Sequence, residues 1–190
     1  MSTQGNEMLE LDLAWRPVVA ALREAVAGIS NRRGLMRTVA GIMMSATEDN
    51  FEQQGRPRWV DLQESTKAAR KATGHWPGPI LQRSGQLAAS IVEYYDNERA
   101  MVGSNKAYAR IHQLGGKTAP HVIKPRNKKA LAFGGIVVAQ VNHPGSSIPA
   151  RPFLYLTPTD QREIYLAARE FLQGKLARAA QRGSQGGAGS

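Results

Sequence analysis

HVIKPRNKKALAFGGIVVAQVNHPGSSIPARPFLYL, residues 121–156, holds the only uninterrupted strand signals of the 190-residue chain. Two short apolar runs, residues 130–133 and 136–141, are separated by Gly134 and Gly135. Runs of this length that are rich in β-branched residues favour strands, and adjacent glycines readily adopt the positive φ angles of a tight turn. The stretch therefore predicts a β-hairpin.

Prolines shape the segment that follows this hairpin. His143-Pro144-Gly145 interrupts the strand, and Arg151 then stands between Pro149-Ala150 and Pro152. Because a proline restricts the residue before it to extended backbone, Arg151 is held extended as a positioned hydrogen-bond donor. It can serve a partner at an interface or an intramolecular salt bridge, and the sequence leaves both open.

Apolar residues spaced by three and four positions predict helices on both sides of this stretch. Pro17 favours a first helix that starts near Arg16. The expected fold class is α+β: a small, mostly antiparallel sheet of four to five strands packed by helices, with a long N-terminal helical region and a C-terminal helix. The helices are expected at residues 16–29, 32–54, 62–73, 106–114 and 157 to about 180, and a second hairpin at residues 90–95 and 100–104.

These elements suggest one folded domain with two extensions. Residues 1–30 are expected to form an N-terminal helical extension, and residues 31–180 a single α+β domain. Residues 181–190 are rich in Gly and Ser, cannot bury apolar surface, and are expected to be a flexible tail. At the other end of the domain, Thr157 and Pro158 predict the start of the C-terminal helix, where Asp160 suits the positive end of the dipole.

Composition excludes several classes of protein. The chain has no cysteine, so it has no disulfide and no thiolate metal site. No apolar run approaches the roughly 20 residues that span a bilayer, so no membrane partner is expected. The formal charge of +10, from 25 Lys and Arg against 15 Asp and Glu, instead suggests acidic partners or nucleic acid.

The densest basic cluster comprises Lys124, Arg126, Lys128 and Lys129. It is either a solvated loop or a site for phosphate or an acidic partner, because loops of this type often carry binding. Specific base readout has no support, since no helix-turn-helix, zinc finger or aromatic stacking platform stands out.

No constellation of residues predicts catalysis. The histidines lie in predicted loops or beside turns without H-E-x-x-H pairing, and Ser84 is explained as a helix cap. Acidic residues such as Glu48, Asp49 and Glu52 fall on predicted helix surfaces. We therefore expect no catalytic, metal or cofactor site and no enzymatic activity. The four histidines are His75, His112, His121 and His143.

In order along the chain, these pieces resemble the virion morphogenesis and tail completion family of tailed bacteriophages. This family includes the S proteins of P2-like phages and the G proteins of Mu-like phages. The resemblance runs from about residue 35 to residue 156, and the order and spacing of its pieces make it specific. The pieces are FEQQGRPRW at residues 51–59, Leu62 with Thr66, IL and SGQL at residues 80–87, VGS at 102–104, YARIHQLGG at 108–116, KALAF at 129–133, HPG at 143–145 and PARPFL at 149–154.

The resemblance implies a structural virion protein that acts in tail completion and head–tail joining, at the neck or as a tail terminator. It implies a homo-oligomeric ring, a hexamer, that contacts neighbouring neck and tail proteins. From the charge, nonspecific contact with packaged DNA is also expected. The protein would be found in the virion and, during assembly, in the host cytoplasm. The alternative, from charge alone, is a nonspecific DNA-binding or DNA-passage protein.

The candidate interface residues are basic or aromatic side chains in predicted loops. Trp59 has a second interpretation, as a hydrophobic anchor that packs its loop onto the long helix. The resemblance implies that the segment around Trp59 is a rigid bend after the long helix, which agrees with the interpretation of Trp59 as a hydrophobic anchor. The candidates are Arg56, Arg58, Trp59, Lys124, Arg126, Lys128, Lys129, His143 and Arg151.

Overall fold

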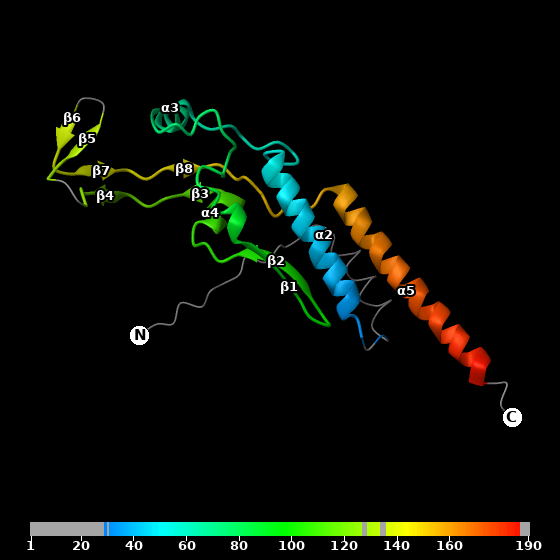
Figure 1. Cartoon of the computed structure of the whole chain (residues 1–190). Coiled ribbons are helices and arrows are strands. Elements are labelled where there is room, and N and C mark those ends of the chain that lie inside the picture. Colours follow the sequence, from blue (N-terminus) through cyan, green and yellow to red (C-terminus); the bar gives the residue numbers. More distant parts are fainter. Residues whose placement is uncertain (1–28, 30, 127–128, 134–135, 187–190) are drawn as a thin grey trace, which may run out of the picture.

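The computed structural model has an α+β architecture in which two long helices lie side by side (Figure 1). These helices are α2 (Arg33–Glu52) and α5 (Pro158–Gly186). The antiparallel hairpin of β1 (Ile91–Tyr95) and β2 (Ala100–Ser104) packs on α2. We call these four elements, with the segments packed on them, the body. The structure describes residues 29, 31–126, 129–133 and 136–186.

The helix predicted at residues 32–54 is confirmed by α2. Its buried residues include Leu35, Met43 and Ala46, whose spacing puts them on the face that meets α5 and the hairpin. On α5, Ile164 and Ala168 are buried four residues apart. Burying a Leu, Ile or Met side chain contributes about 1.5–3 kcal/mol, so the two apolar faces hold the helices together.

Three aromatic side chains form the centre of the main core. Phe153 is fully buried and its ring stacks on Phe51 with centroids 5.4 Å apart. Trp59 meets Phe51 edge to face at 5.9 Å. Aliphatic residues from the helices, the hairpin and the loops surround them: Met43, Ala46, Ile80, Leu87, Ile91, Val102, Ala109, Leu154, Leu156 and Ile164.

The shorter predicted elements are also present. The helix expected at residues 62–73 is α3 (Glu64–Ala72), and the one expected at residues 106–114 is the shorter α4 (Ala109–Leu114). A single 3-10 turn (Ala88–Ser90) leads into β1. Gly115 ends α4 with a φ of +73°, and a Cβ there would lie 2.7 Å from the backbone nitrogen of Ala150, so only glycine fits this position.

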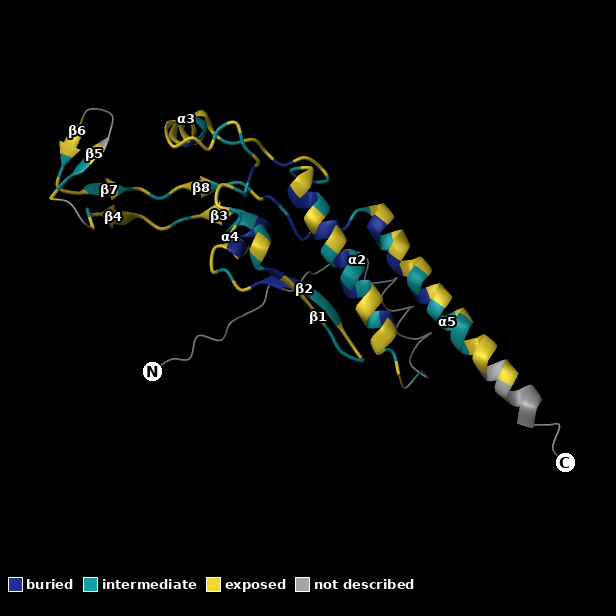
Figure 2. Ribbon diagram, viewed as in Figure 1, coloured by how far each residue is buried: buried dark blue, intermediate teal, exposed yellow. Residues whose placement is uncertain are grey.

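Residues 116–148, which we call the arm, extend away from the body as one long antiparallel excursion (Figure 1). None of the described arm residues is buried (Figure 2). Outward from the body, its paired strands are β3 (Gly116–Lys117) with β8 (Ser147–Ile148), β4 (His121–Ile123) with β7 (Val141–His143), and β5 (Leu131–Phe133) with β6 (Ile136–Val138).

The prediction of one sheet with four to five strands is wrong in its arrangement. The described residues contain eight short strands in four separate antiparallel pairs, and only β1 and β2 lie against a long helix. Prolines at 120, 125, 144 and 149 cannot donate to a strand ladder, which keeps the arm pairs short. The predicted hairpin around Gly134 and Gly135 is confirmed as β5 and β6, although the run at 136–141 is divided between β6 and β7.

The C-terminal helix is longer than predicted. It continues to Gly186, so residues 181–186 are helical and do not belong to a tail as expected. The predicted N-terminal helix and residues 187–190 lie outside the described residues. Among the helices that the structure describes, none is long and apolar enough to cross a bilayer.

Candidate functional site

Arg151 lies inside the body and fastens the root of the arm. The whole residue is only 5% exposed. The guanidinium Nε donates to the carbonyl of Val60 at 3.0 Å and Nη2 donates to that of Asp61 at 3.2 Å. The Arg151 backbone N–H donates to the carbonyl of His112 at 2.7 Å. Of the two roles left open by the sequence, the structure shows the intramolecular one. The partners of the guanidinium are backbone carbonyl oxygens and not the carboxylate that a salt bridge requires.

Both strands of the arm leave the body at this root. Gln113, at the end of α4, accepts a hydrogen bond from the Leu154 backbone through Oε1 at 3.0 Å. Burial lowers the pKa of His112, and the nearby Arg151 charge lowers it further. Burial also lowers the pKa of Arg151, and the nearby Arg70 charge lowers it further, whereas the Asp61 charge raises it. The root thus holds the arm in a fixed direction.

Replacing Arg151 by alanine is expected to lower the free energy of unfolding by about 1.5–3 kcal/mol, the usual range for hydrogen bonds made by a charged group. Urea denaturation followed by circular dichroism measures the change. Arg110→Ala is the matched control, because Arg110 is exposed on α4, and its change should stay within about 0.5 kcal/mol. Equal stability of Arg151→Ala and the parent would contradict the internal role.

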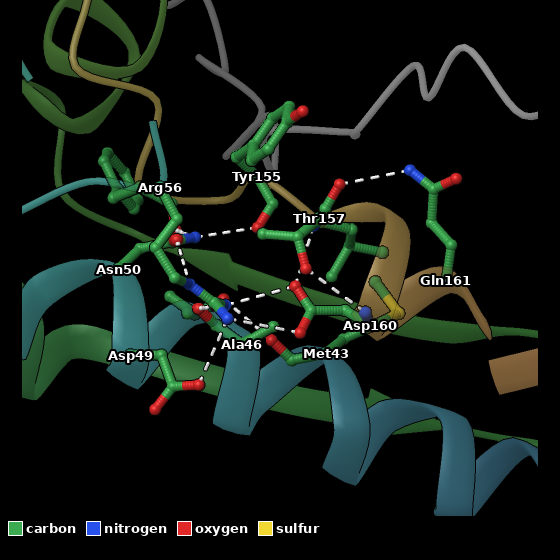
Figure 3. A network of polar contacts seen from close by, with 12 residues as sticks. Met43, Ala46, Asp49, Asn50, Arg56, Tyr155, Thr157, Asp160 and Gln161 are labelled. Atoms are coloured by element: carbon green, nitrogen blue, oxygen red, sulfur yellow. Dashed lines mark hydrogen bonds and ion pairs between the residues drawn. The ribbon is translucent and has the colours of Figure 1, made fainter. Parts of the chain in front are cut away.

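Arg56 joins α2, the loop that follows it and α5 (Figure 3). Its Nε donates to Asn50 Oδ1 at 3.0 Å, and Nη2 donates to the Ala46 carbonyl at 2.8 Å. The same guanidinium pairs with Asp160 through Nη2 at 3.1 Å and with Asp49 through Nη1 at 3.3 Å. Because its donors are used within the chain, Arg56 is a structural residue of the body.

Asp160 also closes the first turn of α5. Its Oδ2 accepts from the Thr157 backbone N–H at 2.7 Å, while Thr157 Oγ1 accepts from the Asp160 N–H at 3.2 Å. This reciprocal arrangement is a capping box in which Asp160 takes the place of the usual Glu. The helix start predicted at Thr157 and Pro158 is confirmed, and Asp160 serves both the cap and Arg56.

Trp59 is a hydrophobic anchor. It is 5% exposed, packs on Phe51, and directs its indole Nε1 toward the Pro152 carbonyl at 3.4 Å. Its neighbour Arg58 is exposed and lines a shallow pocket with Trp76. The anchor interpretation of Trp59 therefore fits its position, and Arg58 is the residue of this segment that faces solvent.

The remaining candidates lie on the arm. Lys124, Arg126 and Lys129 are exposed, and Lys128 lies outside the described residues. His143 pairs with His121 across β4 and β7, with ring centroids 5.0 Å apart, and its Nδ1 accepts from the Gly145 N–H at 3.0 Å. The arm therefore carries Lys124, Arg126, Lys129 and His143, whereas Arg56, Arg58, Trp59 and Arg151 belong to the body.

Two properties of the arm were missed from the sequence. Its apolar side chains remain exposed, with Val122 at 51%, Ile136 at 56% and Val137 at 69%. The longer segment 99–159 contains nine Lys and Arg, five of them on the arm, and no Asp or Glu, which leaves 16 basic and all 15 acidic residues elsewhere. Nearly all of the net charge of +10 therefore comes from this one segment, a signal that a count along the sequence reveals.

Among the described residues, no group of three or more His, Cys, Asp or Glu is close enough to hold a metal ion. The observed arrangement is a body fastened by buried aromatic and arginine contacts, from which a basic and apolar arm extends. Such an arm can bind another macromolecule, because exposed apolar side chains beside uniform charge are typical of an interaction surface.

A family model described as the phage virion morphogenesis family matches residues 13–173, which include the arm and most of both long helices. The chain belongs to this family. The family resemblance seen in the sequence is thereby confirmed, and the match spans the arm and most of the body. The protein is thus a member of a bacteriophage virion assembly family.

Two relatives match almost end to end. "Mu-like prophage FluMu G protein 2" of Haemophilus influenzae is 34% identical over 167 residues, which cover 87% of this chain and 97% of that protein. "Putative capsid assembly protein G" of Escherichia phage Mu is 32% identical over 165 residues, which cover 85% and 92%. No solved structure matches the chain.

Proposed function

We propose that this protein is a structural, non-enzymatic component of the virion that completes the tail and joins it to the filled head. The arm is the observation that carries this proposal. None of its described residues is buried, yet it is fixed at its root by Arg151 and presents apolar and basic side chains to solvent. A fixed surface of this kind serves contacts with other subunits.

We further propose that the copies form a ring at the neck or tail end, with the sixfold symmetry of a tail. A ring arises when two different surfaces of one chain meet in a head-to-tail contact whose rotation closes. The arm and the body are two such surfaces. Arg58, which is exposed beside the pocket near Trp76, is a candidate contact with neighbouring neck and tail proteins.

The test is electron microscopy of lysates from the encoding phage after inactivation of this gene. We expect separate filled heads and separate tails, or tails of aberrant length. A plasmid copy of the gene should restore joined particles and serves as the control. Normal joined particles without the gene would overturn the proposal. Loss of filled heads would instead indicate a role in capsid assembly, the activity named for the phage Mu relative.

The charge of residues 99–159 favours a second candidate, nonspecific binding of DNA. A protein that neutralises phosphates releases counterions, so its affinity falls steeply with salt. Fluorescence anisotropy with a DNA duplex at several salt concentrations tests this candidate. If Lys124, Arg126 and Lys129 contact phosphates, each substitution by alanine reduces the slope of log K against log salt by about one unit.

A further inference from the structure

The arm exposes apolar surface that nothing in the described part of the chain covers. Val137 and Ile136 on β6 are 69% and 56% exposed, and Val122 on β4 is 51% exposed. The strand pairs β4–β7 and β5–β6 have no third strand among the described residues, so their outer edges are unpaired. Free edges with exposed apolar residues are a liability unless a partner occupies them.

The charge of the arm defines the chemistry of that partner. The arm carries Lys and Arg and has no Asp or Glu to neutralise them. A basic surface approaching another basic surface is repelled, whereas an acidic surface attracts and orients it. The partner must therefore be acidic and must also offer apolar surface. The basic arm residues are Lys117, Lys124, Arg126, Lys128 and Lys129.

The body offers a complementary surface on the second half of α2. Residues 38–55 contain Glu48, Asp49 and Glu52 and no Lys or Arg. Glu48 and Glu52 are exposed and four residues apart, so they share one face of the helix. Unlike Asp49, which binds Arg56, they form no ion pair with the described residues.

The start of α5 lies beside this part of α2. Arg56 binds both Asp49 on α2 and Asp160 on α5, so these two helix segments lie together. One turn beyond Asp160, Glu163 is exposed, and Leu166 follows at 43% exposure. We call Glu48, Glu52, Glu163 and Leu166 the acidic end of the helix pair. These residues offer three exposed carboxylates and one exposed apolar side chain, with the exposed Arg162 next to Glu163.

The arm cannot reach the acidic end of its own chain. It points away from α2 and α5 and is held in that direction by the Arg151 contacts (Figure 1). We therefore propose that the arm of one copy docks on the acidic end of the helix pair of a second copy. This inference rests on the proposed ring and names the contact that builds it. Repeating the contact gives a closed ring or an open filament.

Charge reversal in the full-length protein tests the contact. Lys124→Glu with Arg126→Glu reverses the arm, and Glu48→Lys with Glu52→Lys reverses the acidic end. Each pair is expected to lower the association constant between copies about tenfold or more, because like charges then meet. Sedimentation equilibrium measures it. Combining all four substitutions restores attraction, and both association and infectious yield in complementation should return toward those of the parent.

Glu93→Lys with Glu98→Lys is the matched control, because these exposed residues lie on the hairpin of the body and outside the acidic end. This pair should leave association unchanged. A fourfold variant that associates as weakly as the arm variant would overturn the proposal. Loss of DNA affinity in the arm variant alone, without rescue, would assign the arm to nucleic acid.

Cysteine cross-linking gives a readout that does not depend on virion function. The chain has no cysteine, so Val137→Cys on one copy and Leu166→Cys on another introduce a single possible mixed pair. Oxidation of the mixture by a mild thiol oxidant should give a disulfide that joins the Val137→Cys peptide to the Leu166→Cys peptide, identified by mass spectrometry of the digested 20.7-kDa chains. Val137→Cys mixed with Val92→Cys should not give the corresponding mixed peptide pair. Absence of the mixed disulfide overturns the contact, whereas normal particles without the gene overturn only the proposed function.

Discussion

Replacing Phe153 by alanine is expected to lower the free energy of unfolding by about 3–5 kcal/mol, the usual cost of truncating a buried aromatic residue. Phe153 is fully buried and stacks on Phe51 at the centre of the main core. Its removal leaves a cavity that α2 and the segment around Trp59 cannot fill without moving. Urea denaturation of the purified chain measures the loss.

Tyr155→Ala is the control for Phe153. Tyr155 lies two residues later in the same extended segment but is 36% exposed. Its contact with Asn50 is made by the backbone carbonyl, which alanine retains. We expect a change of at most about 1 kcal/mol. Similar losses at both positions would mean that the segment, and not the aromatic core, determines stability.

Replacing Arg56 by alanine is expected to lower the free energy of unfolding by about 3 kcal/mol, since removing one partner of a buried ion pair leaves the other charge uncompensated. The Asp160 side chain is 9% exposed and would keep only its capping contacts with Thr157. Asn50 Oδ1 and the Ala46 carbonyl would also lose their donor. Thermal unfolding by circular dichroism measures the effect.

Asp49→Asn distinguishes the contribution of the exposed Arg56–Asp49 pair from that of the buried Arg56–Asp160 pair. The Asp49 side chain is 46% exposed, and such ion pairs contribute about 0–1 kcal/mol. The contrast between Arg56→Ala and Asp49→Asn therefore tests whether Asp160 is the partner that matters. An Asp49→Asn loss as large as that of Arg56→Ala would assign the main contribution to the exposed pair.

Both predictions concern the stability of the body, to which the arm is expected to contribute little. No described residue of the arm is buried, whereas every residue of the main core lies outside residues 116–148. Substitutions on the arm surface should therefore leave the unfolding free energy nearly unchanged. This separation allows assembly to be tested in the arm without loss of the fold.

Local signals in the sequence were sufficient to predict α2, α3, α5 and the two glycine- or turn-linked hairpins. The spacing of Leu35, Met43 and Ala46 depends only on the helical period, and Thr157 with Pro158 marks a helix start through local backbone chemistry. Trp59 was interpretable as an anchor because a large apolar ring in a short loop usually packs on a neighbouring helix. The phage virion morphogenesis family was also recognisable from the order of these pieces.

The roles of two arginines could not be predicted, because their partners are distant in sequence. Arg56 meets Asp160 across 104 positions, and Arg151 meets Val60 across 91. A side chain in a loop has the same local signal whether it faces solvent or the interior. The sequence therefore made both residues candidates for an interface. Only the packing of the body showed that both side chains lie inside the body.

The sequence by itself determined the helices, the hairpin turns and the concentration of positive charge between residues 99 and 159. Only the tertiary structure decided that the strands after residue 116 pair in isolation on an arm and do not join one sheet. The physical reason is that periodicity and turn chemistry act over a few residues. Whether a strand finds a second neighbour depends on how distant segments pack, and here Arg151 directs both strands of the arm away from the body.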